Sequence, residues 1–266
     1  MKAKAKKILF VLIKTVLVIG FWIAVWALLA KKVGLELLLP SPKTTVITLF
    51  ELIKTYTFWK ITFNSLMNVL IGIIVSLIIG SALAIVTEKS KILNALLSPL
   101  LTVIKSTPIA SFIILTLLWI ERDTIPIFII SLIVIPIVWS NISAGIRSVD
   151  KNLHEVSKVY SFSVTKKILS LYIPSIFPFF LAACKASLGM AWKAGISAEI
   201  LSTPKNTIGT ELYFSKTYFS TEQLFAWTLT VIILSFIIEK ILIFLIQKIA
   251  DRSKFTIKDS KNDVKL

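Results

Sequence analysis

Six long apolar runs dominate this 266-residue chain and restrict it to one class of fold. A helix needs about 20 mostly apolar residues to cross ~30 Å of hydrocarbon, and each run meets that length. Strict polar–apolar alternation is absent, and unpaired backbone groups cannot face lipid, so we predict a helical bundle rather than a barrel. The runs cover residues 8–30, 61–87, 92–120, 124–146, 175–196 and 224–246.

The predicted fold is therefore an all-α integral membrane protein with six transmembrane helices. The first run follows several lysines, as a secretory signal would, but it is too long, contains Lys14 and lacks an A-x-A site. We interpret it as a retained helix. We divide the chain into an N-terminal helix with an extracytoplasmic segment (1–60), a transmembrane domain (61–250) and a cytoplasmic polar tail (251–266).

The net charge of +16 comes from basic residues that are unevenly distributed between the runs. They are concentrated before the first run, in the loop 147–174 and after residue 247. The positive-inside rule therefore predicts that both termini and this loop are cytoplasmic, in the cell membrane of a bacterium or archaeon. Basic segments beside a membrane also explain the charge without nucleic acid, which we exclude as a partner.

The titratable residues do not form a recognisable catalytic or metal site. The carboxylates are scattered singly, and the chain has one cysteine, Cys184, and one histidine, His154. A G-x-x-x-x-G-K-[ST] phosphate loop is absent, so energy for any active process would come from a partner subunit. We predict that the chain is not an enzyme and holds no metal or cofactor. A stripe of small residues predicts a close helix–helix contact in the second run: Gly72, Ser76, Gly80 and Ala84.

A polar island lies between the fourth and fifth runs, over residues 145–178. Its apolar residues recur at helical spacing on both sides of a Ser-Phe-Ser break at 161–163, which predicts two short amphipathic helices. We expect Asp150 to cap the first helix, Ser163 to cap the second, and Pro174 to end the pair. The two apolar stripes are Val149, Leu153, Val156 and Val159, then Val164, Ile168 and Leu171.

Lysines inside apolar runs indicate contact with protein or with a watery cavity, because a cation at mid-bilayer costs about 2.5–3.5 kcal/mol. Lys185 shares a helical face with Gly189 and Trp192. Lys105 lies between Pro99 and Pro108, where missing backbone donors predict a broken helix. These lysines would either line a path that favours anions or bond to freed carbonyl groups and reach an interface.

The polar island resembles the cytoplasmic EAA signature of permeases from binding-protein-dependent ABC transporters. The matching stretches are HEVSKVYS and LYIP. Glu155 stands at the signature's glutamate and Ser161 at its glycine, a turn position of positive φ that is costlier for serine. The resemblance assigns ATPase coupling to this set: Glu155, Val156, Ser157, Ser161, Leu171, Ile173 and Pro174.

Residues 38–250 resemble the nitrate, sulfonate and taurine branch of these permeases. The resemblance extends through LLPSP, NSLMNVLIGIIVSLIIG, LLSPLLTVIKSTPIASFIILTLLWI and PIVWSNISAGIRSVDKNLHE to LYIPSIFPFFLAACKASLGMAWKAGISAEIL. The branch's Gly-x-Gly is reduced to Thr207-Ile208-Gly209. With the lysine argument, the resemblance places these residues along a substrate path: Lys105, Pro108, Lys185, Trp192 and Glu199.

The resemblance implies a homodimer of six-helix subunits with a path on its two-fold axis. Two ATPase subunits would bind ATP and dock on the cytoplasmic loop, and a solute-binding protein would deliver the small-molecule substrate. We expect an anion such as sulfonate, taurine or nitrate. Import of a pyrimidine or vitamin precursor is the alternative within the family, and the alternatives outside it are a lipid-modifying membrane enzyme and a passive channel.

Overall fold

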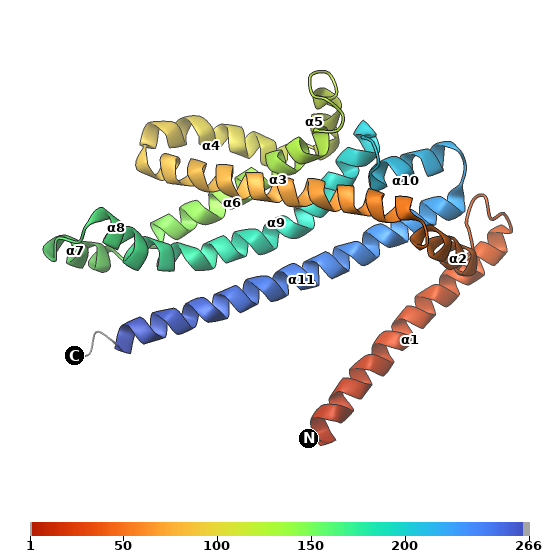
Figure 1. Ribbon diagram of the computed structural model, residues 1–266, viewed down its shortest axis with the longest axis horizontal. Helices are drawn as coiled ribbons and strands as arrows, with labels where there is room; N and C mark the ends of the chain where they lie inside the picture. The colour runs from red at the N-terminus through yellow and green to blue at the C-terminus, as the bar shows by residue number, and fades with distance from the viewer. Residues whose placement is uncertain (1, 263–266) are drawn as a thin grey trace.

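The computed structural model describes residues 2–262, and all of its regular elements are helices. Figure 1 shows long helices lying side by side, with short helices at both ends of the bundle. In chain order the elements are α1 (Lys2–Val33), α2 (Pro42–Ile53), α3 (Tyr56–Lys89), α4 (Lys91–Ser106), α5 (Ile109–Thr116), α6 (Ile125–Arg147), α7 (Lys151–Val159), α8 (Val164–Lys167), the π-helical η1 (Ile168–Tyr172), α9 (Ile173–Ser202), α10 (Ile208–Thr217) and α11 (Thr221–Asn262).

The long helices confirm the predicted membrane spans. Five of the described helical segments are long and apolar enough to cross a bilayer, and the bent pair α4–α5 makes a sixth span if it is taken as one. The two members of this pair meet at an angle of 103°. Pro108 follows the last residues of α4 and begins α5, because its ring and its missing N–H prevent the helix from continuing. The prediction of a broken third span is confirmed.

Helices α3, α6 and α9 form the core of the bundle, and small residues bring them close together. A Cβ atom added to Gly72 would lie 2.6 Å from Cγ2 of Ile130, and one added to Gly80 would lie 2.8 Å from Cβ of Val138. Both partners belong to α6, so the small-residue stripe of α3 makes the close contact that the sequence predicts. On α9, Gly195 packs in the same way against Ile130.

Helix α1 diverges from the other helices (Figure 1) and contacts them near its C-terminal end. The Trp26 ring stacks on Phe225 of α11, with centroids 5.8 Å apart, and the Trp26 indole N–H donates to the carbonyl of Pro40. Most of the described apolar side chains of α1, from Phe10 to Val33, are exposed on the single chain. Such a surface suits lipid or another protein chain rather than water.

Helices α2 and α10 are not among the elements predicted from the sequence. The signals for α2 are present: the Ser41 hydroxyl accepts a hydrogen bond from the N–H of Thr44 at 3.2 Å, and Pro42 occupies the first turn. Helix α10 begins at Ile208 without a side-chain cap, so its start carries a weaker signal. Both helices lie at the end of the bundle opposite α7 (Figure 1).

The polar island forms a hairpin of α7 and α8 at one end of the bundle, together with the α3–α4 turn and the C-terminal end of α11 (Figure 1). The prediction that Pro174 ends the second helix is wrong. Residues Val164–Ser202 form one continuous helical segment through η1 and α9. A π-helical turn, in which Ile173 N–H bonds to the carbonyl of Ile168, accommodates the proline that has no N–H of its own.

The second half of the hairpin is thus the first part of a membrane-spanning segment and not a separate helix. Helix α11 likewise continues to Asn262, into the part of the chain predicted as a polar tail. Residues 263–266 of that tail lie outside the described residues.

Candidate functional site

The two caps predicted for the α7–α8 hairpin are confirmed. The Asp150 carboxylate accepts a hydrogen bond from the N–H of Asn152 at 2.8 Å, and the Ser163 hydroxyl accepts from the N–H of Lys166 at 3.3 Å. Each cap satisfies a backbone donor that the first turn of a helix leaves free. The hairpin is therefore a defined local structure at both helix starts.

Ser161 makes the turn between the two helices and has a φ of +48°. Its N–H donates to the carbonyl of Lys158 at 3.0 Å, and the N–H of Phe162 donates to the carbonyl of Ser157 at 2.9 Å. These bonds close the C-terminus of α7, where a left-handed residue is common and usually glycine. The positive φ implied for this position is confirmed, and serine holds it at a cost of about 1 kcal/mol.

The coupling residues fall into an exposed and a buried group. Glu155, Val156, Ser161 and Ile173 lie on the surface, whereas Ser157 and Leu171 are buried. Most residues of the two apolar stripes are also exposed on the single chain: Val159 is 81% exposed and Val164 is 74% exposed. An amphipathic hairpin with an uncovered apolar face has the composition of a protein-docking surface.

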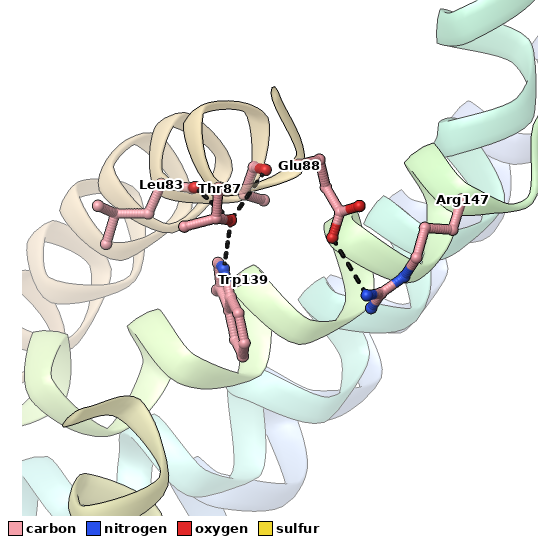
Figure 2. A network of polar contacts seen from close by, with 6 residues as sticks. Leu83, Thr87, Glu88, Trp139 and Arg147 are labelled. Carbon is pink, nitrogen blue, oxygen red and sulfur yellow. Dashed lines mark hydrogen bonds and ion pairs between the residues drawn. The ribbon is translucent and has the colours of Figure 1, made fainter. Parts of the chain in front are cut away.

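One ion pair joins the ends of α3 and α6 beside this hairpin. Nη1 of Arg147 lies 3.3 Å from Oε1 of Glu88, as Figure 2 shows. The Glu88 side chain is mostly buried and Arg147 is mostly exposed, so the pair closes the bundle just before α7 begins.

Lys105 lies in the last turn of α4, beside the break that Pro108 makes. Its Nζ atom is 5.8 Å from the ring centroid of Trp139 on α6. A cation in this position is favoured by the C-terminal dipole of α4 and by the indole ring. The lysine itself is exposed on the single chain.

The structure separates the three residues that the sequence places on one face of α9. Lys185 and Gly189 are exposed, and an added Cβ on Gly189 would have nothing within 4 Å. Trp192 is only 3% exposed and belongs to the buried core. Lys105 and Lys185 therefore reach the surface of this chain and Trp192 does not.

Glu199 is fully buried at the C-terminal end of α9, where its carboxylate accepts three hydrogen bonds. The donors are the Ser65 hydroxyl at 2.8 Å, the Asn68 amide at 3.1 Å and the backbone N–H of Gly209 at 3.1 Å. These bonds tie α9 to α3 and to the start of α10. The geometry favours a structural role, and a place for Glu199 along a substrate path stays a prediction.

The turn after α9 is held from two sides. Asn64 of α3 donates to the carbonyl of Asn206 at 3.1 Å. From the loop after α5, Arg122 donates to the Thr203 hydroxyl at 3.3 Å, and Asp123 accepts from the N–H of Lys205 at 2.8 Å. The turn therefore connects α3, α9, α10 and the loop between α5 and α6.

A cavity of about 370 Å³ lies between α5 and α9. Its lining is apolar apart from one hydroxyl-bearing side chain, that of Ser197. Among the described side chains, no group of three or more His, Cys, Asp or Glu could hold a metal ion. The lining residues are Ile109, Ala110, Ile113, Ser197, Ile200 and Leu201.

Sequence reasoning missed the polar contacts that link separate helices. Trp139, Thr87, Ser65 and Asn68 lie inside apolar runs, and their partners are 52 to 134 residues away along the chain. Only their polar character within membrane spans could have marked them, since such residues are expected to face protein.

Residues 72–255 match the family described as "Binding-protein-dependent transport system inner membrane component". The chain is 28% identical to a putative aliphatic sulfonates transport permease protein of Bacillus subtilis, over 71% of this chain and 68% of the relative. It is 30% identical to a nitrate import permease protein of Synechococcus elongatus, over 52% of this chain and 50% of that relative. A bicarbonate transport system permease protein of that species is 27% identical, over 54% of this chain and 52% of that relative.

The chain thus spans about half the length of the nitrate and bicarbonate relatives. Two solved structures share its fold at low sequence identity. A bacterial ABC transporter for the import of alginate aligns with a TM-score of 0.61 at 17% identity, over 92% of this chain and 98% of that chain. An amino acid ABC transporter aligns with a TM-score of 0.60 at 16% identity, over 74% of this chain and 94% of that chain. These likenesses show the fold alone.

Proposed function

We propose that this chain, which belongs to the family of binding-protein-dependent transport system inner membrane components, is the permease subunit of an ABC importer for a small anion. The family consists of transporter permeases, so the chain is a multi-pass membrane protein and not an enzyme.

The exposed apolar face of the α7–α8 hairpin carries the proposal. Leu153, Val156, Val159 and Val164 are each about half exposed or more, on a hairpin that is otherwise polar and capped at both helix starts. A hairpin at the end of a bundle is not placed to bury these residues in lipid. A soluble ATPase subunit that binds these residues in a groove would bury them. Their burial would stabilise the complex by roughly 25 cal/mol per Å² of apolar surface.

The distribution of basic residues supports a cytoplasmic location for this end. The hairpin, the α3–α4 turn with Lys89 and Lys91, and the C-terminal end of α11 lie at the same end of the chain's fold (Figure 1). The positive-inside rule favours such an end on the cytoplasmic side. The opposite end, with α2 and α10, would then receive a solute-binding protein. We further propose that two copies of the chain assemble around the path, because the face of α9 that carries Lys185 is uncovered.

The anion is supported by two independent observations. The named relatives transport sulfonate, nitrate and bicarbonate, all of which are anions. The exposed lysines of this chain within its spans, including Lys105, Lys185 and Lys193, supply positive charge where a cation is costly in lipid and would face a protein-lined path instead.

The docking test is co-purification of this chain with an ATPase subunit encoded beside it. Glu155→Arg reverses the charge of an exposed side chain on α7, and we expect it to reduce the recovered ATPase at least tenfold. Lys158→Glu, a charge reversal at an exposed position of the same helix on the side away from Leu153, Val156 and Val159, is the matched control. Full recovery of the ATPase with Glu155→Arg would remove Glu155 from the interface, and full recovery with Val159→Asp as well would reject docking at the hairpin.

The transport test uses proteoliposomes that contain the permease, the ATPase and the binding protein. We expect ATP-dependent uptake of a labelled alkanesulfonate, nitrate or bicarbonate. Uptake of a neutral pyrimidine in place of every anion would reject the anion assignment and leave the ABC importer intact.

A further inference from the structure

Trp139 has a fixed orientation in the middle of the bundle. Its indole N–H donates to the Thr87 hydroxyl at 2.9 Å. That hydroxyl donates in turn to the carbonyl of Leu83 at 2.8 Å, one turn earlier in α3, so its lone pairs face the indole (Figure 2). The bond from α6 to α3 therefore determines which way the flat face of the ring points.

The Trp139 ring contacts the charged end of Lys105. The Nζ atom lies 5.8 Å from the ring centroid, within the distance at which an aromatic face attracts a cation. Among the side chains that the structure describes, the ammonium of Lys105 forms no ion pair with a carboxylate, and the ion pair found there joins Arg147 and Glu88. The indole is the group that holds this cation beside the break between α4 and α5.

Lys185 lies at the same level of the bundle. Helices α6 and α9 run antiparallel, since Gly145 packs against Ile176 and Gly195 packs against Ile130. Interpolation between these two contacts places Trp139 opposite Cys184, one residue from Lys185, along the helix axes. Lys105 and Lys185 thus lie at a similar level along the bundle, although they come from different helices, and both are exposed on the single chain.

We infer that Trp139 is a positioning residue for substrate selection. It holds the Lys105 ammonium, without a carboxylate partner, at the level of Lys185, and the two cations together favour the passage of an anion. This inference rests on the proposed function. A purely structural role for Trp139 would make the identity of residue 105 irrelevant to its effect, and this difference is open to experiment.

The first experiment measures the contact itself in the purified permease and does not depend on transport. Reductive methylation with ¹³C-formaldehyde keeps the lysine charge and labels Nζ. The signal that disappears in Lys105→Arg belongs to Lys105, and we expect it to be shifted upfield by the ring current of Trp139. Trp139→Leu should abolish that shift and Trp139→Phe should keep part of it. An unshifted Lys105 signal in the wild-type protein overturns the inference.

The second experiment is a double-mutant cycle on ATP-driven anion uptake. We expect Trp139→Leu to lower uptake about fivefold, which corresponds to the loss of one cation–aromatic contact. Trp139→Phe should recover most of the rate, and Trp139→Leu should have no further effect in a Lys105→Met background. Assembly with the ATPase should stay unchanged in every variant.

The outcomes separate this inference from the proposed function. If Trp139→Leu and Lys105→Met lower uptake independently, or if Trp139→Phe and Trp139→Leu lower it equally, the role of Trp139 is overturned while anion import stands. A wild-type protein that takes up no anion rejects the proposed function, and with it the role of Trp139 in substrate selection, even where the spectra show the contact.

Discussion

The hydroxyl of Ser65 bridges two helices by donating to Glu199 at 2.8 Å while accepting from the backbone N–H of Ile208 at 2.9 Å. One side chain of α3 therefore holds both the last turns of α9 and the first residue of α10. The Asn68 amide and the Gly209 N–H complete the set of donors around the carboxylate. This junction fixes the end of the bundle that lies farthest from the hairpin.

Glu199→Ala should destabilise the protein by about 3 kcal/mol, because it leaves three donors at the junction without their acceptor in a buried site. Glu199→Gln keeps one acceptor oxygen and should cost less. The free energy of unfolding in mixed detergent micelles measures the difference. Glu51→Ala, at an exposed position, is the control, and equal stability of the Glu199→Ala and Glu51→Ala proteins would contradict the account of the junction.

Gly209→Ala should disrupt the same junction for a steric reason. An added Cβ would lie 2.3 Å from Cβ of Glu199 and 2.5 Å from the backbone nitrogen of Ile200, and backbone cannot move aside locally. We expect a loss of about 3 kcal/mol or failure to accumulate in the membrane. Gly189→Ala is the matched substitution, since nothing lies within 4 Å of its added Cβ. Membrane levels of the two variants, compared by immunoblot, test the prediction, which fails if both accumulate equally.

Ser161→Gly should stabilise the hairpin by about 1 kcal/mol, because glycine adopts the observed φ of +48° without the steric cost that serine bears. The hydrogen exchange rate of the Phe162 amide, which bonds to the carbonyl of Ser157, reports on the opening of this turn. That rate should fall about fivefold. Ser163→Gly, which removes the cap of α8, should instead raise the exchange rate of the Lys166 amide. An unchanged exchange rate of the Phe162 amide in Ser161→Gly would contradict the backbone strain assigned to Ser161.

Burial raises the pKa of the Glu211 carboxyl on α10, outside the membrane-spanning segments. A pKa that is higher in the folded than in the unfolded chain means that the folded state binds the proton more tightly, so stability is lower above this pKa and recovers as pH falls through it. Glu211→Gln should therefore stabilise the protein at neutral pH, with a benefit that disappears in acid. Melting temperatures across pH 4 to 8 test this, and a benefit independent of pH would contradict it.

Features set by local sequence could be predicted well. The hydropathy of the chain indicates the spans, Pro108 indicates the break in the third, and Asp150 and Ser163 indicate the hairpin caps, because each depends on residues close in sequence. The small residues Gly72 and Gly80 predict a close contact, although not that α6 is the helix that makes it.

Contacts between distant segments could not be predicted in this way. The pairing of Lys105 with Trp139 depends on how α4 and α6 pack, and no spacing in the sequence encodes it. The interpretation of Pro174 as a stop followed a rule for α-helices, whereas the chain widens into a π-turn that needs no N–H at that position. Burial of Trp192 and Glu199 likewise follows from the packing of the whole bundle.

The uninterrupted helical segment Val164–Ser202 contains 39 residues and is about 60 Å long at 1.5 Å per residue. Its N-terminal end forms part of the hairpin. Near its C-terminal end, Glu199 accepts hydrogen bonds from Ser65 and Asn68 of α3. A tilt of about 5° at one end displaces the other by about 5 Å, which exceeds the width of a water molecule. If an ATPase subunit docks on the hairpin as proposed, a small rearrangement of that subunit would therefore be enough to move the opposite end of this segment together with the junction around Glu199.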